Sequence, residues 1–473
     1  MLKLPDVKVS EAAAVAAPAA GPIMVAHCRV AGVIGMEINV LRAGDRMSPM
    51  KRLFLASLPF ATLVILITTS GRAAAPACDP DNGGIKLPQG FCAAVVAENV
   101  GAARHLVVAP NGDVFVSTRA GRGGAGGGIV ALRDKDGDGK LETREQFGQG
   151  SATGIGMRQG YIYYATPTSI VRYKLPAGQL KPTGEAETVA LELPERRQHS
   201  DKGLAFDGKG GVYVNFGSPS NACQQPDRQP NVPGQDPCPL LDTYAGIFRF
   251  DENKLGQKPA DGHRYSTGMR QEVGLTWHDN SLWAVMHNRD GLDTMWPGKF
   301  TAEQNAEWPA EYLLKVSDGA NFGWPYCFYN NEEKKLVTNP EYGGDGRKSD
   351  RCGGFSPPTV AFPGHWAPND VLFYTGTQFP KQYRGGVFIA FHGSWNRAPL
   401  PMAGYNVTFV PFSGGKPSGS REVFADGFAG KTPIMSPAEA AARPGGLAMG
   451  PDGSLYVTED TKGRIWRVMY RGK

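Results

Sequence analysis

His199 has a side chain and a position suited to general base chemistry. It lies in a polar loop directly before an apolar strand predicted over residues 204–206, which a turn connects to a second strand over 212–216. The ordinary pKa of a histidine lies near neutrality, so its imidazole can accept a proton under mild conditions. Loops at the ends of a rigid β-scaffold often carry catalytic side chains. A single histidine is also commonly structural, and the loop alone leaves both roles open.

Arginine side chains occupy the equivalent position before three other predicted inner strands. These are Arg104, followed by His105; Arg270, followed by Gln271; and Arg443. A guanidinium group binds carboxylates and phosphates through two parallel hydrogen bonds. Arginines that converge with a histidine therefore predict a site for an anionic ligand. The alternative is that these residues cap turns and pair with carboxylates of neighbouring repeats.

An acidic segment over residues 134–145 is a candidate for binding Ca²⁺. It matches the pattern D-x-[DN]-x-[DN]-G-x5-E in full. The flanking residues are predicted to form strands, so the pattern indicates a structural Ca²⁺ loop between two strands rather than a calcium sensor. An acidic hairpin without an ion is the alternative. The predicted ligands are Asp134, Asp136, Asp138 and Glu145.

The main organisational signal is a repeated strand–turn–strand unit. Each copy has an apolar strand, a short turn and a second strand rich in β-branched and aromatic residues, and a further strand follows. Six such units predict an all-β fold, a six-bladed β-propeller of four-stranded antiparallel blades, in which neighbouring blades bury each other's faces. The copies span residues 106–118, 155–166, 204–216, 275–286, 371–391 and 447–459.

The composition agrees with a large β-structure. The 473 residues include 62 Gly and 37 Pro, which indicate many turns and few long helices. The formal net charge is +5 without a dense basic cluster, so nucleic acid is not expected as a partner.

The N-terminal region is expected to lie outside the propeller. Residues 47–77 contain a charged start, an apolar run and a segment of small residues, which is the pattern of a secretory signal peptide. Residues 1–46 are expected to be a disordered leader translated from a mis-assigned start. The propeller domain then spans residues 78–473, with a periplasmic or secreted location and no stable membrane span in the mature form. An uncleaved anchor, or a lipid on Cys78, is the alternative.

Six of the seven cysteines lie in the predicted propeller, and they form three pairs that are close in sequence. Export and an even number of cysteines predict local disulfides that hold loops together. The sequence contains no CxxC segment, so neither a zinc site nor an attached c-type haem is expected. The expected pairs are Cys78 with Cys92, Cys223 with Cys238, and Cys327 with Cys352.

Taken together, these motifs resemble those of the soluble glucose/sorbosone dehydrogenases that depend on pyrroloquinoline quinone (PQQ). The resemblance runs from about residue 87 to the C-terminus. FHGSWNR at 391–397 and HNRDGLD at 287–293 are most similar to the L-sorbosone dehydrogenase-like branch. The other matching segments are HSDKGLAF at 199–206, TGMRQEVGLTW at 267–277, NFGWP at 321–325, HWAP at 365–368 and RPGGLAMGPDGSLYVTED at 443–460.

The resemblance implies a six-bladed propeller that binds PQQ, a tricarboxylate, together with Ca²⁺. It implies that His199 accepts the proton of the substrate hydroxyl during hydride transfer, and that Arg270 is catalytic by polarising the cofactor. Further cofactor contacts are implied for Gln271, His287, Arg397 and Arg443, and Arg104 is predicted as another from its position before an inner strand. The cofactor Ca²⁺ is implied at Asn288 and Arg289, through main-chain carbonyls, and at Asp293.

The predicted function is the oxidation of an aldose, a polyol or a sugar aldehyde. Its partners would be the sugar and an external electron acceptor, either a quinone or a cytochrome. One alternative is a Ca²⁺-dependent propeller hydrolase of the lactonase or esterase type, which would need a metal site rich in carboxylates. Another is a propeller that only binds a ligand, which explains the repeats but not the aligned histidine and arginines.

Overall fold

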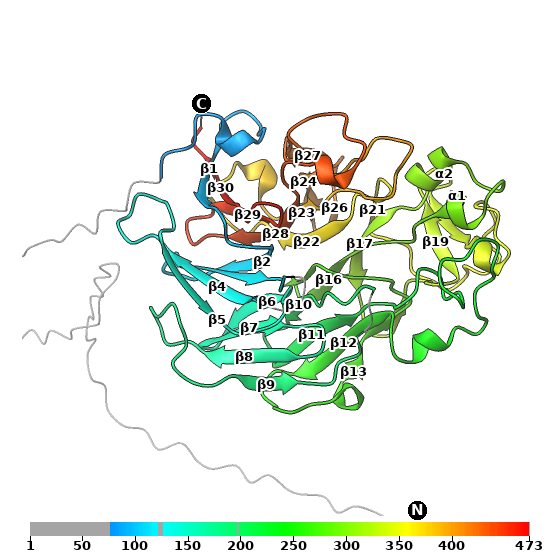
Figure 1. Cartoon of the computed structure of the whole chain (residues 1–473), viewed down its shortest axis with the longest axis horizontal. Helices are drawn as coiled ribbons and strands as arrows, with labels where there is room; N and C mark the ends of the chain where they lie inside the picture. The colour runs from blue at the N-terminus through cyan, green and yellow to red at the C-terminus, as the bar shows by residue number, and fades with distance from the viewer. Residues whose placement is uncertain (1–75, 122–125, 196–197, 473) are drawn as a thin grey trace, which may run out of the picture. The chain divides into compact units, whose positions relative to one another are not determined.

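The computed structural model describes residues 76–121, 126–195 and 198–472, and within these the chain forms six four-stranded antiparallel sheets (Figure 1). The sheets follow one another around a ring, so the prediction of an all-β six-bladed propeller is confirmed. The predicted leader and nearly all of the predicted signal peptide lie outside the described residues, as do Arg196 and Arg197 in the loop before His199.

The first three blades follow directly from the sequence repeats. In each blade the two strands of the repeat unit become the first two strands of the sheet; Leu204, for example, lies opposite Val214. The strands are β2 (Ala103–Val108), β3 (Val114–Thr118), β4 (Gly128–Arg133) and β5 (Thr143–Phe147) in blade 1; β6 (Ile155–Arg158), β7 (Tyr161–Ala165), β8 (Ile170–Lys174) and β9 (Glu187–Ala190) in blade 2; β10 (Leu204–Phe206), β11 (Gly211–Phe216), β12 (Gly246–Asp251) and β13 (His263–Arg264) in blade 3.

The other three blades repeat this order with longer connections. The strands are β15 (Leu275–His278), β16 (Ser281–Met286), β17 (Glu311–Val316) and β21 (Val360–Phe362) in blade 4; β22 (Pro368–Phe373), β23 (Val387–Phe391), β24 (Asn406–Val410) and β27 (Glu422–Ala425) in blade 5; β28 (Pro444–Met449), β29 (Leu455–Glu459), β30 (Ile465–Tyr470) and β1 (Phe91–Ala97) in blade 6.

Blade 6 combines both ends of the described chain. Its outermost strand is β1, which pairs with β30 and places Phe91 opposite Tyr470 and Cys92 opposite Met469. This pairing closes the ring and leaves no unpaired strand between the first and last blades.

The core lies between neighbouring blades rather than in one central mass. Strand β1 shows why: Phe91 and Ala93 pack in a cluster with residues of blade 5, whereas Ala94 and Val96 pack in a cluster with residues of blade 1. Successive side chains of a strand point to opposite faces, so both faces of a blade are buried. Inner strands such as β3 and β23 are therefore buried along their whole length.

Short elements lie in the connections between strands. The helices α1 (Leu292–Met295) and α2 (Ala302–Glu307) lie between β16 and β17. The small sheets are β14 (Ser266–Thr267) with β18 (Ala320–Asn321), β19 (Cys327–Asn330) with β20 (Lys335–Thr338), and β25 (Phe412–Ser413) with β26 (Lys416–Pro417). Single 3-10 turns occur at Asn82–Gly84, Pro239–Asp242, Pro259–Asp261, Pro340–Tyr342, Lys381–Tyr383 and Pro437–Glu439.

The three predicted disulfides are all confirmed. Cys78 bonds to Cys92, and the other two pairs close as expected from their spacing. A lipid on the Cys78 sulfur is incompatible with this bond, so that alternative is wrong for the structure described here. No helix among the described residues has the length and apolar composition that a membrane crossing needs.

Candidate active site

The loops at one end of the blades enclose a cavity of about 290 Å³. In an antiparallel sheet, the start of the first strand, the end of the second and the start of the third lie at the same edge. Loops before β10 and β15, the segments after β16 and β23, and the start of β17 therefore meet there. The lining residues are Gln198, His199, Arg228, Arg270, His287, Asn288, Asp290, Glu311, His365, Ala367, Trp395 and Asn396.

His199 lines this cavity, and among the described residues only one of its ring nitrogens has a hydrogen-bond partner. Its Nδ1 lies 2.5 Å from the carbonyl oxygen of Ser218. A carbonyl can only accept, so Nδ1 carries the proton and Nε2 keeps its lone pair. Burial, and then the positive charge of Arg270, lower the pKa of His199 to about 3. The imidazole is therefore neutral at pH 7 and can accept a proton at Nε2.

The backbone around His199 is shaped to hold the ring in this position. His199 has a φ of 55°, in the left-handed region that most residues avoid. A Cβ atom on Gly217 would lie 2.5 Å from the His199 carbonyl oxygen and 1.9 Å from Oε1 of Gln271. Glycine at 217 is thus required for the close approach of the two loops.

The lowered pKa of His199 predicts a pH profile. The active neutral form is already complete above pH 5, and protonation sets in only as the pH falls toward 3. We expect kcat to show no loss near pH 6.5, where an ordinary histidine would become charged. Steady-state turnover measured between pH 8 and pH 5 checks this; a halving centred near pH 6.5 would show that His199 titrates normally.

Asp290 is the electrostatic centre of the cavity. Its Oδ2 accepts hydrogen bonds from Arg228 (2.6 Å) and Arg270 (2.8 Å), and its Oδ1 accepts one from Asn396 (2.9 Å). These arginines hold the pKa of Asp290 well below its usual range, against the effect of burial. The two guanidinium groups share this carboxylate, and Arg228 also pairs with Asp227 at 3.7 Å.

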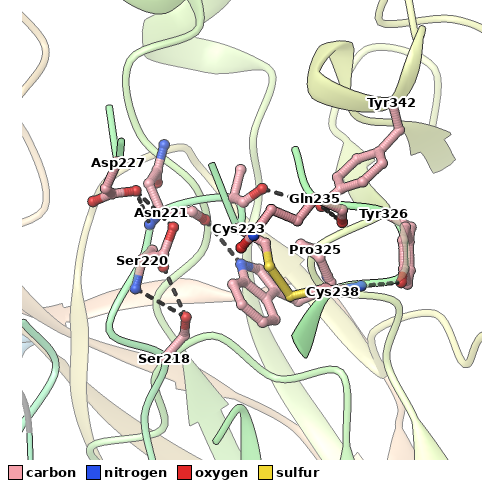
Figure 2. Close-up of a disulfide and its surroundings, with 12 residues drawn as sticks. Ser218, Ser220, Asn221, Cys223, Asp227, Gln235, Cys238, Pro325, Tyr326 and Tyr342 are labelled. Carbon is pink, nitrogen blue, oxygen red and sulfur yellow. Dashed lines mark hydrogen bonds between the residues drawn. A yellow bond between two sulfur atoms is a disulfide. The ribbon is translucent and has the colours of Figure 1, made fainter. Parts of the chain in front are cut away.

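Arg228 comes from a loop between β11 and β12 that the Cys223–Cys238 disulfide closes (Figure 2). Between β11 and β12, Asp227 accepts hydrogen bonds from the Ser220 hydroxyl (2.6 Å) and from the backbone N–H of Asn221 (3.0 Å), which fold the chain back. Asn221 is also linked by two 3.0 Å hydrogen bonds to the backbone of Asp290. The disulfide loop is therefore tied directly to the cavity.

Replacing Cys223 and Cys238 together by serine is expected to lower the free energy of unfolding by about 3 kcal/mol, the entropy of closing a loop of this length. It should also lower kcat/KM, because the freed loop carries Arg228. Denaturant unfolding and steady-state kinetics measure the two effects. The matched control is Cys78→Ser with Cys92→Ser, whose separation of 14 residues is close to the 15 of the first pair. An equal loss of kcat/KM in both variants would contradict the link between this loop and the site.

Glu311, at the start of β17, is a buried acid on the cavity wall. It accepts the backbone N–H of Asn288 at 2.8 Å. Burial raises its pKa to about 8, so it is largely protonated at neutral pH. It therefore adds little negative charge to the cavity.

Two further histidines line the cavity, and each donates one ring N–H to a backbone carbonyl oxygen. Nε2 of His287 donates to Pro368 (2.9 Å), and Nε2 of His365 donates to Asn305 (2.6 Å). Burial lowers the pKa of His287 to about 4, with smaller contributions from Arg270 and other positive groups. Both rings are neutral at pH 7 and serve as polar walls.

A second group of charged residues includes two of the predicted arginines. Arg104 pairs with Asp201 at 3.2 Å and with Asp460 at 3.3 Å, and Asp460 also pairs with His392 at 3.0 Å. Arg443 donates to the carbonyl oxygen of His392 at 3.1 Å. Arg104 thus behaves as the alternative foresaw, pairing with carboxylates of other blades. Neither arginine belongs to the lining of the His199 cavity.

Three predicted site residues have side chains that are used elsewhere. Arg397 donates to the carbonyl oxygens of Ala306 (2.7 Å), Gly364 (3.2 Å) and Pro401 (3.1 Å) and pairs with Glu307. The wholly buried Arg289 guanidinium pairs with Glu341 at 2.6 Å. Asp293 caps the next residue of α1 through a 2.8 Å bond to the Thr294 amide. None of the three lines the cavity.

Several residues that line the cavity were not predicted from the sequence, among them Arg228, Glu311 and Gln198. Arg228 lies far from His199 in the chain, and only the disulfide loop returns it to the site. Glu311 reads as the first residue of an ordinary strand. Gln198 directly precedes His199, so its position in the same polar loop was a signal; its amide donates to Asp227 at 2.8 Å.

The cavity fits an anionic cofactor accompanied by a divalent cation. Nε of Arg270 is buried and has no hydrogen-bond partner among the described residues. The side-chain nitrogen of Asn288 is equally without one. Within the same part of the chain, no hydrogen bond reaches the backbone carbonyls of Asn288, which lines the cavity, and of Arg289, which follows it in the chain, so both oxygens are available as hard donors.

The acidic loop between β4 and β5 brings together three of its four predicted ligands. Carboxylate oxygens of Asp134, Asp136 and Asp138 lie within 4.8 Å of one another, and the fourth member of this group is Glu142. Glu145 lies in β5, opposite Ala131. Glu145 is therefore outside this group, and its role as a ligand stays a prediction.

A Ca²⁺ titration distinguishes these two glutamates. If the loop binds Ca²⁺, the ion should raise the melting temperature of the wild type, and Glu142→Gln should reduce that rise while Glu145→Gln leaves it intact. Differential scanning calorimetry with Ca²⁺ and with a chelator measures the shift. The reverse order of the two variants would support Glu145 as the ligand.

The fold and this site define a class: a ring-shaped β-propeller with a neutral histidine and clustered arginines at one end of its blades. The model of one family, described as TrAA12-like, matches residues 85–471. The chain belongs to the TrAA12-like family.

Curated relatives match only part of the chain. An uncharacterised protein of Borreliella burgdorferi is 29% identical over 206 residues, which are 43% of this chain and 48% of that protein. A pyrroloquinoline quinone-dependent pyranose dehydrogenase of Coprinopsis cinerea is 27% identical over 257 residues, 47% of this chain and 34% of that protein. The matches thus span about half and about a third of the length of these relatives.

Solved structures share the fold at low identity. The holo form of the PQQ domain of the Coprinopsis cinerea pyranose dehydrogenase superposes with a TM-score of 0.64 at 18% identity, covering 84% of this chain and 99% of that one. A family AA12 enzyme of Trichoderma reesei gives a TM-score of 0.65 at 18% identity, covering 82% and 98%. The apo aldose sugar dehydrogenase of Escherichia coli gives 0.53 at 17% identity, covering 80% and 100%.

Proposed function

We propose that this protein is a PQQ-dependent sugar dehydrogenase, an oxidoreductase that oxidises an aldose, a polyol or a sugar aldehyde. The observation that carries the proposal is that His199 lines a cavity with Arg270 and Arg228 while its Nδ1 is bound to the Ser218 carbonyl, which leaves Nε2 as the basic nitrogen. Membership of the TrAA12-like family supports it, since a curated relative of the chain is a PQQ-dependent pyranose dehydrogenase.

In this function the residues of the chain bind and orient the reactants and move one proton. Arg270 and Arg228 would hold carboxylates of PQQ, and the carbonyls of Asn288 and Arg289 would hold Ca²⁺. When bound, PQQ with Ca²⁺ supplies an electrophilic quinone that takes up a hydride. Nε2 of His199 takes the proton of the substrate hydroxyl. The Nδ1–H bond to Ser218 keeps the ring in the required tautomer and orientation.

The other predicted cofactor contacts have different support. Gln271 is buried and bonds to the Asp201 carbonyl at 3.2 Å, so it supports the loop of His199. His287 lies in the cavity and is available to substrate or cofactor through Nδ1. Arg104 and Arg443 are proposed to extend the positive field toward PQQ from the neighbouring charged group. The closer similarity to the L-sorbosone dehydrogenase-like branch rests on FHGSWNR and HNRDGLD alone.

A metal-dependent hydrolase is less well supported by the cavity. Such an enzyme needs open carboxylates for its metal. Asp290 already binds two arginines and an asparagine, and Glu311 is largely protonated at neutral pH. A propeller that only binds a ligand would need no neutral histidine held in one tautomer.

Reconstitution tests the proposal. The purified protein is titrated with PQQ and Ca²⁺, and reduction of a dye is followed with a panel of aldoses, polyols and sugar aldehydes. Saturable PQQ binding with sugar-dependent dye reduction is the expected result. Absence of PQQ binding, or binding without oxidation of any member of the panel, would contradict it. The three disulfides favour an oxidising compartment, and we propose a periplasmic or secreted enzyme with an external quinone or cytochrome as acceptor.

A further inference from the structure

Trp395 is an aromatic side chain with an unusual position at the rim of the cavity. It is 58% exposed, and it is the one aromatic among the large hydrophobic side chains that are exposed in the described part of the chain. It nevertheless lines the same cavity as His199 and Arg270. An indole left in water next to a ligand site costs apolar burial unless a ligand covers it.

The turn that carries Trp395 is fixed on both sides. On one side, the buried Ser394 exchanges hydrogen bonds with Ala403 at 2.8 and 2.9 Å, and its carbonyl accepts the Tyr405 hydroxyl at 2.6 Å. On the other side, Asn396 donates to Asp290 at 2.9 Å. The exposure of Trp395 is therefore imposed by a well-anchored backbone.

Arg397 now has a clear role in this turn. Its guanidinium donates to three carbonyl oxygens and pairs with Glu307, which ties the end of the turn to the chain around α2 and β21. This explains why a conspicuous arginine next to the cavity points away from it. Together, Ser394, Asn396 and Arg397 hold one indole at the cavity mouth.

We propose that Trp395 is a stacking platform for the ring of the sugar substrate and helps to determine which sugars are accepted; the proposal rests on the function proposed above. A pyranose ring has an apolar face of C–H groups, which a flat indole can cover, and a rim of hydroxyl groups. Gln198, Arg228 and His287 surround the cavity with donors and acceptors for such a rim. An acyclic substrate of the same polarity would gain less binding free energy from contact with the indole.

The test compares Trp395→Ala and Trp395→Phe with the wild type after reconstitution with PQQ and Ca²⁺. We expect Trp395→Ala to raise KM for the preferred cyclic sugar by about tenfold, equivalent to about 1.4 kcal/mol of lost stacking and burial. We expect kcat and PQQ affinity to stay within about twofold, and Trp395→Phe to recover most of the affinity. Leu255→Ala, which removes another exposed apolar side chain outside the cavity lining, is the control and should change none of these values.

Two other outcomes would overturn the proposal. An unchanged KM for every sugar in Trp395→Ala would do so, as would a rise confined to the KM of the electron acceptor, which would make the indole an acceptor contact. Sugar binding measured by calorimetry on the PQQ-loaded protein separates this inference from the proposed function. If the wild type binds a sugar but does not oxidise it, the function fails while the affinity difference between the variants still tests Trp395. If the wild type binds no sugar, the platform fails as well.

Discussion

Replacing His199 with asparagine is expected to lower kcat by about 10²- to 10⁴-fold, the usual contribution of a positioned general base. Asparagine tolerates the left-handed backbone found at this residue, with its φ of 55°, and its side-chain amide can still donate to the Ser218 carbonyl. It has no basic nitrogen to accept the substrate proton. The substitution therefore removes the base while disturbing the loop little.

The measurement is steady-state dye reduction, accompanied by titration with PQQ. PQQ affinity should stay within about threefold of the wild type, because the arginines that would hold the cofactor are unchanged. His263→Asn is a suitable control, since His263 is exposed and pairs with Asp318 outside the cavity lining. If His199→Asn kept full turnover, His199 would have no part in proton transfer.

Replacing Asp290 with asparagine is the second substitution with a large expected effect. The Arg228 and Arg270 guanidinium groups both lie within 2.8 Å of the same carboxylate oxygen. An amide at this position would leave Arg270 without its carboxylate partner, next to Arg228, which would keep only its 3.7 Å pair with Asp227. Removal of one partner of a buried ion pair typically costs about 3–5 kcal/mol. We expect a loss of stability of that order in the apoprotein, measured by denaturant unfolding.

Cofactor binding should change in the same variant. The two guanidinium groups would no longer be held by a common partner, so PQQ affinity should fall, and the same concentration of PQQ should add less stability to Asp290→Asn than to the wild type. Asp318→Asn serves as the control because its partner, His263, is exposed. Unchanged stability and affinity in Asp290→Asn would mean that Asp290 does not organise the arginines.

Most of the fold could be predicted from the sequence, because each blade repeats the same local pattern. Residues 204–216 illustrate this: an apolar strand, a glycine-containing turn and a second apolar strand form β10 and β11 as the alternation predicts. The closure of the ring by β1 could not be predicted, because no local sequence pattern indicates that the first strand pairs with the last blade.

The site was only partly predictable. His199, Arg270, His287 and Asn288 line one cavity because each lies at the same edge of its blade, and that position can be counted along the chain. The contacts of the Arg397 side chain with carbonyl oxygens and Glu307 could not be predicted, because motif similarity identifies the turn but not the direction of a side chain. Arg228 was missed because its approach depends on a long loop and a disulfide, and neither has a periodicity that indicates its endpoint.

The pairing of β1 with β30 also has a consequence for how the protein is made. The two strands lie at opposite ends of the described chain, so the ring cannot close until the last strand has been synthesised. Until then, β30 presents an open edge that the β1 of another chain fits equally well. Dilute refolding should therefore favour closed monomers, and concentrated refolding should favour dimers that have exchanged their first strands.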